Sequence, residues 1–222
     1  MNWLKLLKLW QKYNGVFLNG LIGTLWISAL VLALGSLLGL LVTLVRMTRV
    51  KPVRRIGSIY IEILRGTPVL LQLYFFWIGL PKLLPALELT DTQCVLTALV
   101  INASAYISEI FRAGIDAVDK GQFEAARSLG MSELHVMTRI ILPQAIKNIL
   151  PAMGNEFIST IKGTSLASVF FVGELMTSQK TIQSATFLAL ESLTIVGVIY
   201  FILSFVLSKL LKLLERRLKA SE

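Results

Sequence analysis

The longest uncharged stretch of the chain runs from Tyr13 to Val45 and is mostly apolar. An α-helix needs about 20 such residues to cross a hydrocarbon core about 30 Å thick, so this stretch predicts a tilted transmembrane helix at Val16–Val45. The stretch is longer than the apolar region of a signal peptide, about 7–15 residues, and no small-residue cleavage site ends it. Gly35 and Gly39 form a GxxxG pair, which either lets another helix approach closely or is a chance pair in a glycine-tolerant helix.

Further apolar segments follow along the chain. Hydrophobic residues make up 55% of the sequence, which is above the ~45–50% that is typical of soluble proteins. Four more segments predict membrane-spanning helices: Ile56–Leu80, Thr92–Ile110, Ile146–Phe171 and Phe187–Leu211. Within Met1–Lys12, Trp and Leu recur at helical spacing with Lys on another face, which predicts a short helix lying in the membrane interface. We therefore expect an all-α integral membrane protein in which residues 1–222 form a single transmembrane domain of five transmembrane helices after an N-terminal interfacial helix.

The distribution of Lys and Arg predicts the orientation in the membrane. Three segments carry five Lys or Arg residues each: Arg46–Arg55, Arg112–Lys147 and the tail from Lys209. The opposite side carries six: Lys5, Lys8, Lys12, Lys82, Lys162 and Lys180. Because cytoplasmic loops are rich in Lys and Arg, we expect an external N-terminus and a cytoplasmic C-terminus, although the N-terminal lysines oppose this assignment. Cys94 should then lie at the outer end of the third helix and react with external thiol reagents unless neighbouring helices cover it.

Several function classes are disfavoured by the composition. The net charge of +9 would suggest a nucleic-acid partner in a soluble protein, but in a membrane protein the same cations set orientation, so we expect no nucleic-acid partner. Cys94 and His135 are the only residues of their types, which excludes an intrachain disulfide and a Cys or His metal cluster. The sequence contains no GxxxxGK[ST], HExxH or GxSxG motif, so we expect no enzymatic activity, no ATP hydrolysis and no bound cofactor.

The polar segment at about residues 112–145 predicts two short helices joined by a turn. Phe123–Leu129 contains strong helix formers, and Gly130 fits the left-handed position that ends a helix. Ser132 can cap the next helix, and Pro143 comes just before the fourth predicted span. Helix pairs of this kind in a cytoplasmic loop either pack on the helix bundle or dock on a partner.

The same segment resembles a known family motif. Glu124, Ala125 and Ala126, then Gly130, and then Ile140, Leu142 and Pro143 are similar to the EAA signature of permease subunits of bacterial ATP-binding-cassette (ABC) importers. Further residues resemble the polar amino acid branch of that family: Arg65–Pro68, Gln72, Ala105, Tyr106, Glu109, Ile110, Pro151, Asn155–Phe157, Lys162 and Thr164–Leu166. Gly163 departs from the branch, which usually has an acidic or amide residue there.

The resemblance implies a type I ABC importer permease fold in a bacterial cytoplasmic (inner) membrane. It further implies that Glu124, Ala125, Ala126 and Gly130 belong to a coupling helix that inserts into the ABC ATP-binding subunit, where ATP is bound. The other implied partners are an extracellular or periplasmic amino-acid-binding protein, membrane lipid, and a second permease, either another copy or a paralogue. Arginine, histidine, glutamine and cystine all remain open as the transported polar L-amino acid.

Several polar residues are predicted to lie near the middle of the membrane. Pro68 is about 18 Å along its predicted helix from the cytoplasmic end, Glu156 about 15 Å along its own, and Asn102 about 15 Å from the outer end of the third helix. Ionisable residues at this depth are candidate functional groups, and Pro68 should break its helix there. We expect the substrate to contact six residues: Thr67, Pro68, Gln72, Asn102, Ser104 and Glu156.

Other interpretations of these residues and of the whole chain stay open. The polar groups could instead satisfy one another in a packed bundle, as we expect for the i,i+3 pairs Glu62–Arg65 and Glu109–Arg112. The external binding protein alone could then set specificity. A second function class is a membrane scaffold or receptor subunit that signals to a soluble partner, and a third is a channel or secondary transporter. The coupling-type loop favours the importer over the channel, and the midplane polar residues favour it over the scaffold.

Overall fold

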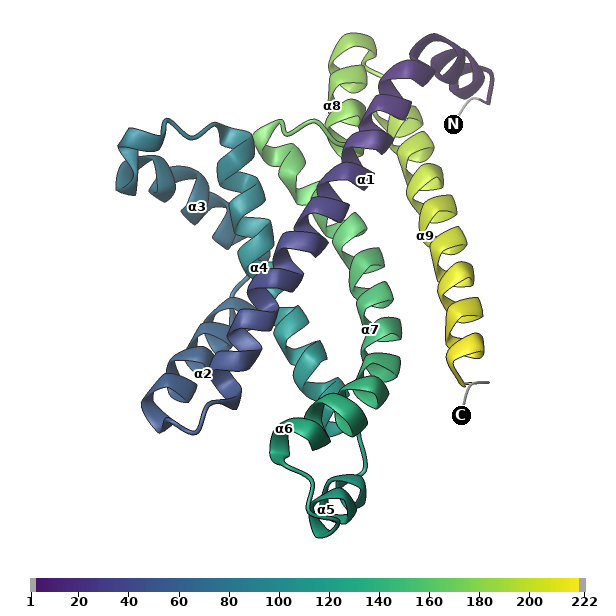
Figure 1. Ribbon diagram of the computed structural model, residues 1–222. Helices are drawn as coiled ribbons and strands as arrows, with labels where there is room; N and C mark the ends of the chain where they lie inside the picture. Colours follow the sequence, from purple (N-terminus) through teal and green to yellow (C-terminus); the bar gives the residue numbers. More distant parts are fainter. Residues whose placement is uncertain (1–2, 220–222) are drawn as a thin grey trace.

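The computed structural model describes residues 3–219, and within them the chain is helical throughout, with no strand (Figure 1). The α-helices are α1 Trp3–Met47, α2 Lys51–Gly66, α3 Val69–Leu83, α4 Asp91–Asp116, α5 Lys120–Ser128, α6 Glu133–Val136, α7 Leu142–Gly163, α8 Leu175–Thr186 and α9 Ala189–Lys219. Two 3-10 helices, η1 Pro85–Leu87 and η3 Thr164–Phe170, and one π-helical turn, η2 Met137–Ile141, connect them.

Three of the described helices, α1, α4 and α9, are long and apolar enough to cross a membrane. The second predicted span consists of two helices, α2 and α3, bent by 109° at Thr67 and Pro68, and this pair would be a fourth span if counted as one. The fourth predicted span begins earlier and ends earlier than expected, because α7 passes into a 3-10 helix after Gly163. The all-helical fold is therefore confirmed, and the number of five membrane spans stays a prediction.

The N-terminal segment is continuous with the first span. The sequence separates a short interfacial helix from a helix at Val16–Val45, whereas the structure joins them into α1, whose first turns bend away from the rest of the helix (Figure 1). Leu9 and Phe17 are buried against Leu175 of α8 and Val196 of α9, which fixes these turns to the bundle. Met1 and Asn2 of the predicted interfacial helix lie outside the described residues.

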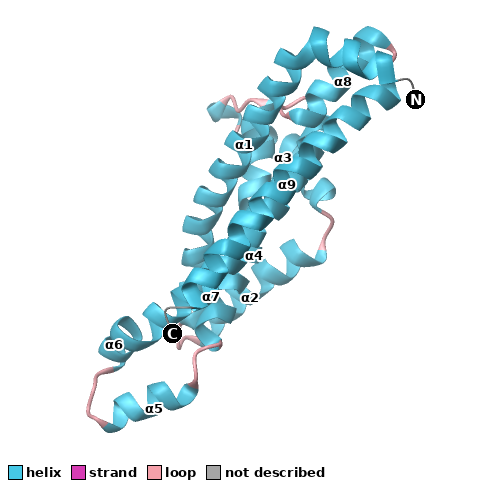
Figure 2. Cartoon of the chain, turned by 90° about the vertical axis from the view of Figure 1, so that its right-hand side faces the viewer, coloured by secondary structure: helices cyan, strands magenta, loops and turns pink. Residues whose placement is uncertain are grey.

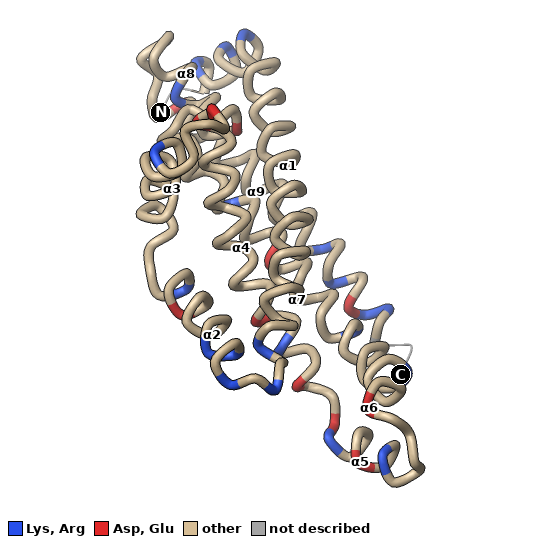
Figure 3. Tube along the Cα trace, turned by 60° about the vertical axis from the view of Figure 1, so that its left-hand side comes forward, with Lys and Arg blue, Asp and Glu red and all other residues tan. Residues whose placement is uncertain are grey.

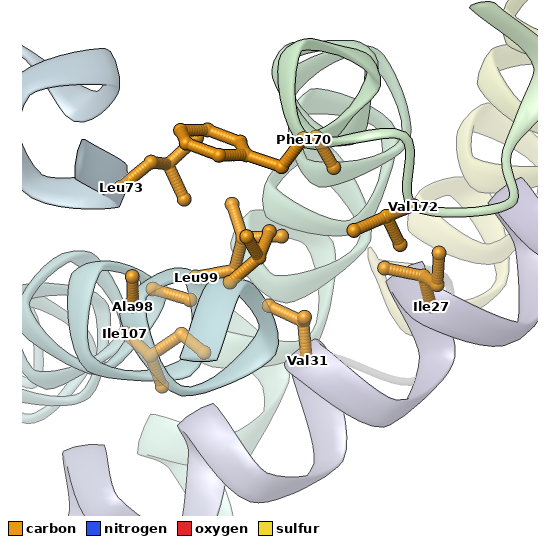
Figure 4. Packing of buried hydrophobic residues seen from close by; sticks show 11 residues of the cluster. Ile27, Val31, Leu73, Ala98, Leu99, Ile107, Phe170 and Val172 are labelled. Carbon is orange, nitrogen blue, oxygen red and sulfur yellow. The ribbon is translucent and has the colours of Figure 1, made fainter. Parts of the chain in front are cut away.

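The core of the molecule lies between α1 and α4. Figure 4 shows Ile27 and Val31 of α1 facing residues of α3, α4 and η3 in a cluster of buried hydrophobic side chains. Its other labelled members are Leu73, Ala98, Leu99, Ile107, Phe170 and Val172. Where the two helices cross, a β-carbon placed at Gly35 would lie 3.2 Å from Ala103 Cβ, and one at Gly39 would lie 3.0 Å from the Ser104 carbonyl oxygen. Of the two possibilities that the sequence leaves open for the GxxxG pair, the structure supports close helix approach, with α4 as the partner.

We expect Gly39→Val to weaken this crossing. The added side chain would meet the Ser104 carbonyl oxygen and Ile107 at 3.0–3.1 Å, and overpacking of this kind costs about 1–3 kcal/mol. The matched control is Gly15→Val, because no atom lies within 4 Å of a β-carbon at Gly15 and the intrinsic helix penalty is the same. Thermal unfolding of the purified chain in detergent should show a lower midpoint for Gly39→Val only, and equal midpoints for the two variants would contradict the proposed packing.

The α5–α6 hairpin projects at the end of the bundle opposite the N-terminus, and the C-terminal turns of α9 lie at the same end (Figure 2). Its local structure follows the sequence prediction. Gly130 has φ +83, the left-handed conformation that ends α5, and the Ser132 hydroxyl accepts the His135 backbone N–H at the start of α6. Figure 3 shows Lys and Arg gathered at the α1–α2 turn, in the hairpin and along the last turns of α9.

Candidate substrate pathway and coupling loop

The side chains of Thr67 and Gln72 form hydrogen bonds with backbone carbonyl groups at the break between α2 and α3. Pro68 has no N–H group, so the Leu64 carbonyl loses its partner one helical turn later. The Gln72 side-chain amide takes that place, donating to the Leu64 carbonyl at 2.8 Å and to the Thr67 hydroxyl at 2.8 Å. Thr67 in turn donates to the Ile63 carbonyl at 2.8 Å. Pro68 therefore causes the break, and the carbonyl groups of Ile63 and Leu64 beside it accept hydrogen bonds from the Thr67 and Gln72 side chains.

Gln72 also connects the break to α4. Its side-chain oxygen accepts a hydrogen bond from the Asn102 amide at 2.9 Å, and Gln72 itself is only 6% exposed. The Asn102 amide nitrogen donates in this contact, and the Asn102 side-chain oxygen has no hydrogen-bond partner within the described part of the chain. The position of Asn102 is thus fixed from the α2–α3 side while its acceptor atom stays available.

A cavity of about 250 Å³ lies between α4 and α7 and contains two of the predicted substrate residues, Asn102 and Glu156. Residues that sequence reasoning missed complete its polar lining: Tyr106, Ser159 and Thr160. Among residues 3–219, Glu156 has neither a hydrogen-bond nor an ion-pair partner. Gly163 also lines the cavity, and a β-carbon there would have no atom within 4 Å. The Glu156 carboxylate and the Asn102 side-chain oxygen therefore share one small cavity, and neither accepts a hydrogen bond from the described residues.

A larger cavity of about 830 Å³, the vestibule, lies next to the first, between the last turns of α2 and the ends of α4, α7 and α9 that lie toward α5 and α6. Both cavities have Tyr106 and Glu156 in their walls, so these two residues separate the small cavity from the vestibule. The guanidinium of Arg65 lies over the Tyr106 ring, 5.4 Å from its centroid, and Arg65 also lines the vestibule. A ligand in the small cavity would therefore leave toward the α5–α6 end past Tyr106 and Glu156.

The other predicted substrate residues lie away from the small cavity. Ser104 is fully buried, donates to the Ile101 carbonyl at 2.7 Å and lies 2.7 Å from the Tyr60 hydroxyl, so it faces α2. Thr67, Pro68 and Gln72 do not line either cavity, and their observed contacts stabilise the break. The spacing of Asn102 from Tyr106, and of Glu156 from Ser159 and Thr160, is one helical turn, which is the sequence signal that identifies the missed residues.

Glu109 joins three helices near the vestibule. Arg112 of α4 donates to it at 2.9 Å, as the sequence predicts, and Arg46 of α1 forms a second ion pair with it. Arg65 lies 3.8 Å from the same carboxylate. The expected Glu62–Arg65 pair is not among the ion pairs of the described residues, because the arginine turns toward α4 instead. Helical spacing alone could not distinguish a neighbour on one helix from a neighbour across the bundle.

The predicted coupling residues divide into a buried and an exposed group. Ala126 is 3% exposed and packs with Val136 and Ile141, so it holds the hairpin together. Glu124 and Ala125 are exposed. The turn after α5 also exposes large apolar side chains, with Leu129 at 84% and Leu134 at 71% exposed. This surface is available to another subunit.

Comparison with known proteins identifies the class. A family model described as the binding-protein-dependent transport system inner membrane component matches residues 35–220. The chain belongs to this family, and it is a multi-pass inner-membrane permease subunit of an ABC importer of the amino acid type.

Individual relatives are similar over nearly their whole length. The arginine transport system permease protein ArtQ of Bacillus subtilis is 39% identical over 92% of this chain and 93% of its own. The glutamine transport system permease protein GlnP of Escherichia coli is 38% identical over 88% of this chain and 90% of its own. A crystal structure of an amino acid ABC transporter with histidines has a chain that is 44% identical, with a TM-score of 0.89 over 98% of this chain and 99% of that one. The methionine transporter MetNI, at 18% identity and a TM-score of 0.78 over 93% of this chain and 98% of that one, shares the fold.

Proposed function

We propose that this chain forms half of the translocation pathway for a polar L-amino acid and that a partner subunit drives it by ATP hydrolysis. The observation that carries the proposal is the small cavity beside the opening to the vestibule, in which the Glu156 carboxylate and the Asn102 side-chain oxygen accept no hydrogen bond from the described residues. Its volume of about 250 Å³ is just below the ~300–1,000 Å³ of typical small-molecule pockets, which suits a ligand as small as an amino acid. The second half of the pathway would be another copy of the chain or a paralogue.

The chemistry of the cavity favours the cationic end of the substrate. An α-ammonium group has three N–H donors, and every amino acid carries one, so Glu156 and the Asn102 oxygen can bind it whatever the side chain. A basic side chain could occupy the same acceptors. The relatives include permeases for arginine, glutamine and cystine. The polar group that these three amino acids have in common is the α-amino acid group. We infer that Gln72 and Thr67 act on the substrate through Asn102, by holding it in place, and that Ser104 packs α4 against α2.

The α5–α6 hairpin is proposed as the coupling element to the ATPase. The chain has no phosphate-binding GxxxxGK[ST] loop, so ATP would be bound by the partner and no cofactor by this chain. The exposed residues Glu124, Ala125 and Leu129 would contact the ATPase. Ala126 would transmit movement of the ATPase to the hydrophobic cluster that it forms with Val136 and Ile141. An external amino-acid-binding protein would deliver the substrate at the opposite end.

Purification from cells that express the whole system separates this proposal from its alternative. An affinity tag on the chain should recover an ABC ATPase whose hydrolysis rises several-fold when the loaded binding protein is added. A scaffold or receptor subunit could bind a soluble partner but would not make its ATP hydrolysis depend on an amino acid. Recovery of a partner without amino-acid-stimulated hydrolysis would therefore favour the scaffold.

The orientation can be tested with introduced cysteines. Cys94 is fully buried, so it cannot report the side of the membrane, and a Cys94→Ser background removes it. In that background we expect Ala86→Cys, exposed beyond α3, to react with an impermeant maleimide in intact cells. Ser128→Cys, exposed on α5, should react only after permeabilisation. The reverse pattern would invert the proposed topology, in which the N-terminus is outside and the C-terminus cytoplasmic.

A further inference from the structure

A third cavity, which is basic, lies between α1, α2 and α4, separate from the small cavity and the vestibule. It has a volume of about 200 Å³ and six lining residues: Thr43, Arg46, Met47, Arg54, Ser58 and Arg112. Three of the six are arginines and none is acidic, so the pocket presents guanidinium groups from three helices to a single space. The α1–α2 turn beside it contacts α6 through an ion pair of 2.6 Å between Arg49 and Glu133, which places the pocket at the end of the molecule that carries the coupling hairpin.

The charges around this pocket are incompletely neutralised. Arg46 and Arg112 share Glu109, and Arg112 also contacts Asp116 at 2.6 Å. Neither of these carboxylates lines the pocket. The Arg54 side chain has no ion-pair partner within the described residues, and the buried Nε of Arg112 has no hydrogen-bond partner there. Because the Arg54 guanidinium is unbonded within the described residues and two further arginines line the same cavity, the pocket is suited to a tetrahedral phosphate.

We propose that this pocket binds the phosphate group of an anionic phospholipid of the cytoplasmic leaflet. Clusters of Lys and Arg directly beyond a transmembrane helix attract anionic headgroups, and this turn holds five such residues at Arg46–Arg55 (Figure 3). A free anion would need only the arginines. A lipid also needs an apolar surface for its acyl chains, and exposed apolar side chains of α1 and α2 surround the turn: Leu44, Met47, Val50, Val53 and Ile56.

Native mass spectrometry of the delipidated full-length chain tests this binding. Phosphatidylglycerol should form a one-to-one adduct at about tenfold lower concentration than phosphatidylcholine. Arg54→Gln should weaken the phosphatidylglycerol adduct by about tenfold or more, the effect expected from loss of a hydrogen bond between a guanidinium and a phosphate group. The matched control is Arg55→Gln, which removes the same charge from an exposed neighbour that does not line the pocket. Ser58→Phe keeps the three arginines but fills the pocket, so it should abolish the preference for phosphatidylglycerol over phosphatidylcholine.

Three results would overturn the assignment. Equal binding of phosphatidylglycerol and phosphatidylcholine by the wild-type chain would show that the pocket does not select an anionic lipid. Equal losses in Arg54→Gln and Arg55→Gln, or a preference that survives Ser58→Phe, would show general surface attraction and no defined pocket. Displacement of phosphatidylglycerol by inorganic phosphate at equal concentration would identify a soluble anion as the ligand. Unfolding midpoints of Arg54→Gln and Arg55→Gln, measured in parallel, should match that of the wild type, since neither arginine side chain has a bond to lose in the described residues.

Discussion

Glu156→Gln should lower amino acid uptake by about ten- to hundredfold while leaving assembly with the ATPase intact. The substitution keeps the shape of the side chain and removes its charge, and a hydrogen bond to a charged group contributes about 1.5–3 kcal/mol. Glu156 is the one carboxylate in the small cavity and has no partner among the described residues that could compensate. The measurement is uptake of labelled amino acid by the reconstituted transporter, with basal ATP hydrolysis recorded in the same vesicles.

The control for this variant is Glu62→Gln. Glu62 is exposed on α2, lines neither cavity and has no ion-pair partner among the described residues, so the same chemical change should leave uptake unaltered. Normal uptake in Glu156→Gln together with failure of Asn102→Ala would identify Glu156 as a structural carboxyl. Normal uptake in both would show that the pathway does not hold the substrate here and that the external binding protein alone sets specificity.

Gly130→Val should uncouple ATP hydrolysis from uptake. Gly130 has φ +83, and a β-branched residue adopts this conformation at a cost of about 1–2 kcal/mol, which changes a conformational equilibrium about 5- to 30-fold. Space is not the obstacle, because no atom lies within 4 Å of a β-carbon at this position. The strain would instead reorient Leu129 and the rest of the turn that is proposed to contact the ATPase.

Gly130→Asn separates backbone strain from the loss of glycine itself, because asparagine tolerates the left-handed conformation. We expect uptake and substrate-stimulated ATP hydrolysis to stay near wild-type levels in Gly130→Asn and both to fall in Gly130→Val, with equal amounts of each variant in the membrane. Normal stimulation in Gly130→Val would contradict the coupling role of the turn.

Local backbone chemistry explains which structural features were predictable. Pro68 lacks an N–H group and breaks the second span, Gly130 takes positive φ and Ser132 caps α6, all as the sequence indicates. These features depend on one residue and its near neighbours in the chain. The close approach at Gly35 and Gly39 was one of two possibilities that the sequence left open, and the sequence could not identify α4 as the partner helix.

Contacts across the bundle explain what was missed. Gln72 reaches the Leu64 carbonyl because the helix bends by 109° between them, and the sequence did not predict this contact. Ser104 was grouped with Asn102 by proximity along the chain, but the two point to different neighbours because they lie on different faces of α4. Position along the helix therefore did not determine the direction of each side chain.

Transport by the reconstituted system is the decisive test of whether this chain forms part of an ATP-driven amino acid importer. The chain, its ATPase and the binding protein would be placed in vesicles containing ATP and offered labelled arginine, histidine, glutamine and cystine in turn. We expect accumulation of at least one of these amino acids, dependent on ATP and lost when the ATPase cannot hydrolyse ATP. Uptake that persists without ATP, or active hydrolysis that moves no amino acid in any of the four assays, would contradict it.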